Sequence, residues 1–209
     1  GLDKVAINIT DEVVVVAPSA DLIKILEATS GVVTAKVKGS AAELIKVLEE
    51  AKTTDKLTLT VTDTDPITAA DLLALDGKTS VVVDAKAASI TGTAADVKKL
   101  LASKGVSLAK NVNITLDPDT EVSAADVNAI AKATGGVVTA TVAAGTAAAL
   151  NKALGNAVST DKITLVVSGK TATASDLLAL DGKTGKKVGA AEVESITGTV
   201  ADLKKVFAA

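Results

Sequence analysis

Short segments in which apolar and polar residues alternate recur along the chain. In residues 57–62, Leu57, Leu59 and Val61 alternate with threonines, and the same period of two is found in residues 33–38, 112–116 and 138–142. A period of two is typical of β-strands that turn one face to a core and the other to water. Because the strands of two-sided α/β sheets are apolar on both faces, this alternation favours a sheet that is covered on one side only.

Between these segments lies a recurring phrase that is typical of a helix start: Ser or Thr, two small residues, an acid and an aliphatic residue. The hydroxyl of the first residue caps the helix, and the acid three residues later completes a capping box. Aliphatic residues follow at helical spacing, which predicts one apolar stripe for each helix. Six full copies begin at Ser40, Thr68, Thr93, Ser123, Thr173 and Thr199, and two weaker copies begin at Ser19 and Thr146.

Glycines follow most of the predicted helices. Glycine adopts the left-handed conformation that often ends a helix without a steric penalty. We therefore expect left-handed C-terminal caps at Gly31, Gly77, Gly105, Gly135, Gly155 and Gly182.

The eight phrases form two blocks of four. Asp21 matches Asp126 and Asp96 matches Asp202, 105 and 106 residues later, and residues 73–79 return unchanged as residues 178–184. Residues 8–10 and 113–115 also match, and both have the Asn-Xaa-Thr pattern of a glycosylation site, which duplication explains better than selection for a sugar. We interpret residues 1–209 as one domain of two four-coil blocks, about 1–105 and 106–209.

The order strand, helix, strand predicts parallel neighbouring strands joined by right-handed crossovers. We therefore predict a right-handed α/β solenoid of eight strand–helix coils, with one parallel sheet and helices on one side. In outline this fold is similar to a leucine-rich repeat, but the sequence lacks the Asn or Cys ladder of that family.

The composition excludes several kinds of chemistry. The chain contains no His, Cys, Met, Trp, Tyr, Arg or Gln, and Phe207 is its only aromatic residue. Proton transfer by imidazole, thiolate chemistry and base stacking are therefore excluded. A net charge of −3 is the wrong sign for a nucleic-acid surface, and the longest apolar run, residues 13–17, is far shorter than the roughly 20 residues of a membrane helix. We expect a non-enzymatic protein without catalytic residues, cofactor, nucleic-acid partner or membrane insertion.

Two acidic loops and one glycine motif are candidate binding sites. Asp63 and Asp65, and likewise Asp117 and Asp119, offer oxygen ligands to calcium, but each pair adjoins a proline in an ordinary turn sequence, so calcium binding stays open and we assign no metal site. The Asp-Gly-Lys-Thr phrase at residues 76–79 resembles the end of a phosphate-binding loop. It lacks the first glycine of that motif and precedes a strand, so we interpret it as a helix end and turn.

Two surfaces have features of an interface. Threonines on the wet sheet face, such as Thr58, Thr60 and Thr139, offer a regular hydroxyl array for a sugar or an ice-like surface, although Thr is also simply a good strand residue. Val13, Val14, Val15 and Val16 form an apolar run near the first coil where the second block has Pro-Asp-Thr-Glu. Because unpaired strand edges invite association, we expect self-association through the open ends of the solenoid at these valines.

The phrases Leu75 to Thr79, Val82 to Ala85 and Ser89 to Val97 resemble the Ala/Thr-rich repeats of giant bacterial surface and secreted proteins. The resemblance covers essentially the whole chain and implies an extracellular or cell-surface spacer or adhesin-like array. The chain departs from that family in its many Lys and Glu residues on helix faces, which together with the reduced alphabet are typical of engineered surfaces. Two functions therefore remain: a designed or consensus-derived scaffold without an evolved ligand, made as a recombinant product, or an excerpt of a surface protein that binds through its sheet face or open ends.

Overall fold

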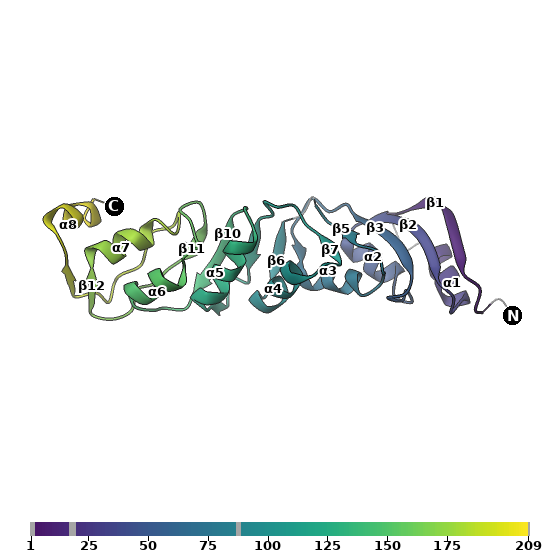
Figure 1. Cartoon of the computed structure of the whole chain (residues 1–209), viewed down its shortest axis with the longest axis horizontal. Helices are drawn as coiled ribbons and strands as arrows, with labels where there is room; N and C mark the ends of the chain where they lie inside the picture. Colours follow the sequence, from purple (N-terminus) through teal and green to yellow (C-terminus); the bar gives the residue numbers. More distant parts are fainter. Residues whose placement is uncertain (1–2, 17–19, 87–88, 209) are drawn as a thin grey trace. The chain divides into compact units, whose positions relative to one another are not determined.

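The computed structural model describes residues 3–16, 20–86 and 89–208. Over these residues the chain is a mixed α/β protein with eight helices and with parallel strands (Figure 1). It divides into two compact units, of which the first comprises Gly1–Gly92 and Lys99–Val112 and the second Thr93–Lys98 and Asn113–Ala209. The parallel α/β architecture is therefore confirmed, and the single continuous domain stays a prediction.

The first unit holds a parallel sheet in the strand order β1-β2-β3-β5-β7. Two further short strands, β4 and β6, also pair in parallel, with Ile67 opposite Ile90. Its elements are β1 (Ile7–Val15), α1 (Ala20–Ala28), β2 (Val33–Gly39), α2 (Ala41–Val47), β3 (Lys56–Val61), β4 (Ile67–Thr68), α3 (Ala69–Asp76), β5 (Val83–Asp84), β6 (Ile90–Gly92) and β7 (Val106–Ser107).

The second unit repeats the alternation of strand and helix. Its long strand β10 pairs in parallel with β8, β9 and β11, and β12 pairs with β13. Because β8 and β9 both pair with β10, they occupy the same place in the sheet order. Residues 117–120 form the loop that connects these two strands. The elements are β8 (Ile114–Leu116), β9 (Glu121–Val122), α5 (Ala124–Ala133), β10 (Val138–Val142), α6 (Ala147–Ala153), β11 (Lys162–Thr164), β12 (Thr171–Thr173), α7 (Ala174–Asp181), β13 (Ser195–Thr197) and α8 (Val200–Val206), and α4 (Ala94–Ala102) begins in this unit and ends in the first.

The predicted alternation of buried and exposed strand residues is confirmed. In β2, Val33, Ala35 and Val37 are buried while Lys36 and Lys38 are exposed. The strand β3 follows the same pattern. Helix residues such as Leu44 and Leu72 are also fully buried, so the core of the first unit lies between one face of its sheet and its helices. Fully burying an aliphatic side chain contributes about 1.5–3 kcal/mol to the free energy of folding. We therefore expect this core between sheet and helices to contribute most of the unit's stability.

The predicted helix starts are confirmed at all six full phrases, where the Ser or Thr hydroxyl accepts a hydrogen bond from the N–H three residues later. The reciprocal bond to the backbone of the cap, which defines a complete capping box, is present at Ser40, whose N–H donates to Glu43. The hydroxyl of Ser40 also donates to Glu43 at 2.8 Å, and the hydroxyls of Thr93 and Thr199 donate to their aspartates at the same distance. Thr146 also caps its helix, and Ser19 lies outside the described residues.

The predicted left-handed glycine caps are wrong. Gly77 and Gly182 end their helices with φ of −69° and −68°, which is right-handed. In the described part of the chain the glycines with positive φ are Gly92 and Gly169. Close packing explains Gly31 instead, because an added Cβ would lie 2.6 Å from the carbonyl carbon of Val5.

The two blocks also differ in strand register. The sequence match pairs Ile9 with Ile114, but Ile7 lies opposite Val33 in β2 and Ile114 lies opposite the matching Val138 in β10. The register of β1 shifts between Asn8 and Glu12. The two Asn-Xaa-Thr triplets therefore do not occupy equivalent positions.

Candidate functional site

Five polar side chains are buried in the described residues, and all follow a helix or directly precede a strand. They are Thr29, Asp55, Thr79, Asp161 and Thr184, and we call them the turn ladder. Buried polar groups are costly unless they are hydrogen-bonded. The turn ladder is therefore the first candidate for a functional site.

The two aspartates of the ladder bind backbone N–H groups. Asp55 is 0% exposed, and its carboxylate oxygens accept hydrogen bonds from the N–H of Val33 and of Lys52, both at 2.8 Å. Asp161, 106 residues later, accepts the matching bonds at 2.8 and 3.0 Å. Val33 lies in β2 and Val138 in β10, so each carboxylate joins the start of its own strand to the neighbouring parallel strand.

Two threonines of the turn ladder also bind backbone groups of the neighbouring strand, each through its single hydroxyl. The hydroxyl of Thr79 donates to the carbonyl of Leu57 at 2.7 Å and accepts from its N–H at 3.0 Å. Thr184 makes the matching bonds to Ile163 at 2.6 and 3.1 Å. Sequence reasoning missed this ladder. The available signal was the return of the same polar residues one block later.

The Asp-Gly-Lys-Thr phrase lies in these turns. Helix α3 ends at Asp76, Gly77 is its C-cap, and strand β5 follows. The ammonium group of Lys78 donates to the carbonyl of Glu49 at 2.7 Å, and Thr79 belongs to the ladder. The interpretation as a helix end and turn is confirmed.

The acidic loops hold the carboxylates that are candidate calcium ligands. The Asp63 carboxylate accepts a hydrogen bond from the N–H of Ala41 at 2.7 Å, at the start of α2. In the other loop the backbone carbonyl of Asp117 accepts from the N–H of Thr120. Asp65 and Asp119 are exposed. In residues 3–16, 20–86 and 89–208, no three acidic, His or Cys side chains gather where they could hold a metal ion.

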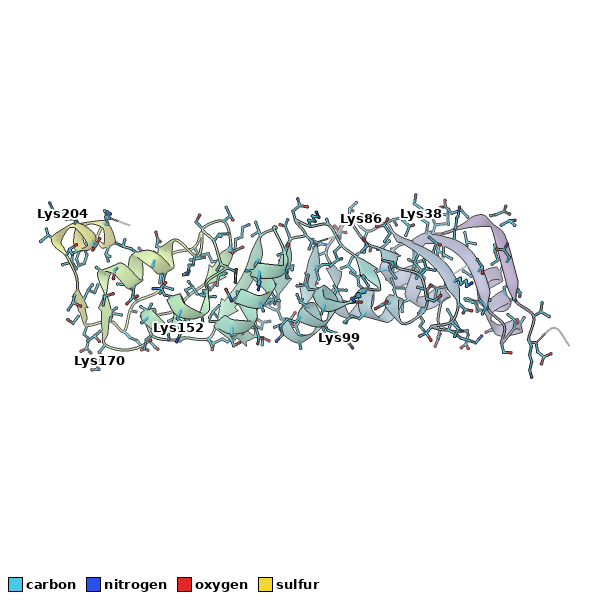
Figure 2. All side chains as sticks on the ribbon, in the orientation of Figure 1. Lys38, Lys86, Lys99, Lys152, Lys170 and Lys204 are labelled. Atoms are coloured by element: carbon cyan, nitrogen blue, oxygen red, sulfur yellow. The ribbon has the colours of Figure 1, made fainter. Side chains whose placement is uncertain are left out.

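The exposed face of the first sheet mixes threonine with lysine. In the register of β2 and β3, Lys36 lies opposite Thr58 and Lys38 opposite Thr60. Thr60 in turn lies opposite Asp84, which is 3.6 Å from the ammonium group of Lys86. Lys38 of β2 and Lys86, in the turn after β5, both project outward (Figure 2). The surface is therefore a charged one and not an uninterrupted hydroxyl array.

The valine run is only partly exposed. Val13 is half-buried and Val15 is 2% exposed, so it belongs to the core. Val14 and Val16 are 55% and 81% exposed. These valines continue an edge strand, because β1 stands at the end of its sheet order.

One ion pair joins neighbouring helices within the second unit. The ammonium group of Lys98 on α4 contacts the carboxylate of Asp126 on α5. The hydrogen bond from Lys98, together with one from Ser123, lowers the pKa of Asp126 below its ordinary value. No sequence motif indicated this pair, whose members stand 28 residues apart.

A cavity of about 200 Å³ lies between α7, β13 and α8. Its lining residues are mainly apolar and include two charged residues. The lining comprises Leu177, Leu178, Asp181, Lys187, Val188, Ala190, Ile196 and Val206. At the two ends of α8, Val200 and Phe207 are 73% and 79% exposed.

None of the described helices combines the length and apolar character needed to cross a lipid bilayer. Comparison with known proteins finds no matching family model, no matching curated protein and no matching solved structure.

Proposed function

We propose that the chain is a non-enzymatic structural scaffold, folded as one right-handed solenoid of eight strand–helix coils with its helices on one side of a parallel sheet. The observation that carries this proposal is the turn ladder. Asp55, Thr79, Asp161 and Thr184 each bond to the strand one coil earlier. Their polar atoms are engaged with backbone groups of the protein itself, which supports a structural role for these residues and not a binding one.

The two matched blocks support the same proposal. Asp55 and Thr79 of the first block correspond to Asp161 and Thr184 of the second, and all four are buried. In repeat proteins each unit packs on its neighbours, and stability is a sum of unit and interface terms. The reduced set of residue types supports an origin by design or consensus, and the exposed Thr and Lys rows of the sheet are the surface through which a natural adhesin-like module would bind.

Small-angle X-ray scattering of dilute monomer tests the solenoid. We expect a rod-like intermediate region, in which intensity falls with the inverse of the scattering vector. A compact globule of this length has a radius of gyration of about 17 Å, and we expect a clearly larger value. A globular profile, or two bodies that vary in their separation, would contradict a continuous array.

A calorimetric screen tests the absence of an evolved ligand. Calcium and a panel of glycans are titrated into the protein, with an Asp63→Ala, Asp117→Ala double variant as the control for calcium. We expect no saturable heat. Saturable glycan binding that is lost on replacing Thr58 and Thr60 by alanine would instead identify the sheet face as an adhesin-like site.

A further inference from the structure

The last helix lacks cover that its copy in the first block possesses. On α4, Val97 and Leu100 are 0% and 1% exposed. The matching residues on α8, Leu203 and Val206, are only half-buried, and α8 has no buried residue. The apolar cavity beside Val206 lies at the same place. The surface of α8 and β13 therefore presents apolar area of the kind that is covered on α4.

The first helix, α1, also leaves apolar surface exposed that its copy in the second block buries. Ile130 on α5 is fully buried, whereas the matching Ile25 on α1 is half-buried. Strand β1 stands at the end of its sheet order and is nine residues long. An edge strand of this length offers unpaired backbone groups to a further parallel strand.

The chain contains a template for joining two such coils. Lys98 of α4 contacts Asp126 of α5 within the second unit. In the repeat, Lys98 matches Lys204 on α8, and Asp126 matches Asp21 on α1. Both Lys204 and Asp21 are exposed, and Figure 2 shows Lys204 projecting from α8.

The net charges of the end segments agree with this pairing. Among residues 3–32 the acids Asp3, Asp11, Glu12, Asp21 and Glu27 outnumber the lysines Lys4 and Lys24. Helix α8 instead carries two lysines in its last turn. An acidic first coil and a basic last helix attract each other and reduce the tendency of like ends to meet.

We propose that the surface of α8 and β13 docks the first coil of a second copy of this chain. In the docked pair, Lys204 of one copy contacts Asp21 of the next, and α1 covers Leu203 and Val206. This inference rests on the proposed scaffold, because it extends the repeat from one molecule to another. Because the contact joins two different surfaces, each docked pair still has one free first coil and one free α8 surface. Further copies can therefore add head to tail and form an open chain.

Sedimentation velocity over a range of protein concentration and salt tests this docking. We expect the wild-type protein to form a concentration-dependent series of dimers and longer chains. Lys204→Glu replaces the proposed attraction by repulsion and should weaken association by about fivefold, the scale expected of an exposed ion pair. Adding Asp21→Lys to Lys204→Glu restores an opposite-charge pair and should recover the affinity.

Lys205→Glu is the matched control. It makes the same change of net charge on the same helix, but the Lys98–Asp126 template places no contact there, so we expect an affinity close to wild type. Equal weakening by Lys204→Glu and Lys205→Glu, or failure of the double variant to recover, would overturn the proposed register. A wild-type protein that stays monomeric at all concentrations would overturn the docking itself.

The scattering experiment keeps this inference separate from the proposed function. A monomer with a rod-like profile and no self-association would leave the scaffold standing and refute the docking. A monomer without a rod-like profile would refute the scaffold, whatever its state of association.

Discussion

Replacing Asp55 by alanine removes a carboxylate that binds two backbone N–H groups in a site with no exposed surface. A hydrogen bond to a charged group contributes about 1.5–3 kcal/mol, and a buried donor left without a partner costs a comparable amount. Val33 is fully buried, so its N–H would lose its partner without gaining a hydrogen bond to water. Lys52 is half-buried, so its N–H can bond to water instead. We therefore expect the free energy of unfolding to fall by about 3–4 kcal/mol, a large part of the roughly 5–15 kcal/mol typical of a folded protein.

The measurement is urea unfolding followed by far-ultraviolet circular dichroism, because the chain has no Trp or Tyr to report by fluorescence. Asp55→Asn is the graded variant. Its amide oxygen accepts one N–H while its amino group faces the other, so we expect about half the loss. Asp65→Ala, at an exposed position of the loop that follows β3, is the control and should change stability by less than about 0.5 kcal/mol.

The reasoning would be refuted if Asp55→Ala and Asp65→Ala lowered stability equally. It would also be refuted if Asp55→Asn cost as much as Asp55→Ala, because hydrogen-bond acceptance would then not be the source of the effect. The denaturant slope must be compared first, since a changed slope signals altered cooperativity and not only altered stability.

Three further changes probe packing and charge. Leu59→Ala empties a fully buried position and should lower the free energy of unfolding by about 2–5 kcal/mol, as measured by urea unfolding. Gly31→Ala places a Cβ against the carbonyl group of Val5 and should cost about 1–3 kcal/mol, with thermal unfolding as the assay. Lys98→Ala removes the first cause of the lowered pKa of Asp126, so carbon-detected NMR titration should show that pKa rise toward its ordinary value. Because the folded pKa lies below the unfolded one, the pair stabilises the protein above about pH 3.8 and this contribution disappears as the pH falls through the folded pKa.

Each of these three predictions would be contradicted by a specific result. A loss below about 1 kcal/mol for Leu59→Ala would show that the strand residues are not packed in a core. An unchanged melting temperature for Gly31→Ala would mean that the segment before β1 moves aside freely. If the pKa of Asp126 does not change in the Lys98→Ala variant, the ion pair is not its cause, and Lys99→Ala serves as the control on the same helix.

The features that the sequence predicted are those set by neighbouring residues. The alternation in residues 57–62 and the caps at Thr68 and Ser123 depend on a few positions each, and the structure confirms them. The shift in β1 was missed because the pairing of Asn8 and Glu12 with β2 depends on a partner strand and not on the local pattern.

The contacts between neighbouring strands and helices were harder to predict. A lone aspartate such as Asp55 before a strand is ordinary turn chemistry, and nothing beside it in sequence indicates that its partner is Val33. Lys98 and Asp126 look like two solvated charges until a fold brings their helices together. The glycine prediction failed for a related reason, since Gly31 responds to the crowding of a distant backbone and not to the helix that it follows.

The turn ladder also shapes how the chain can acquire its structure. Its bonds to earlier turns and strands join residues only 21–24 positions apart. The entropy lost on closing a loop grows with its length, and proteins dominated by such sequence-local contacts fold quickly. A nascent chain leaving the ribosome can therefore complete the bonds of each strand and helix once the next turn has emerged, without waiting for its C-terminal residues.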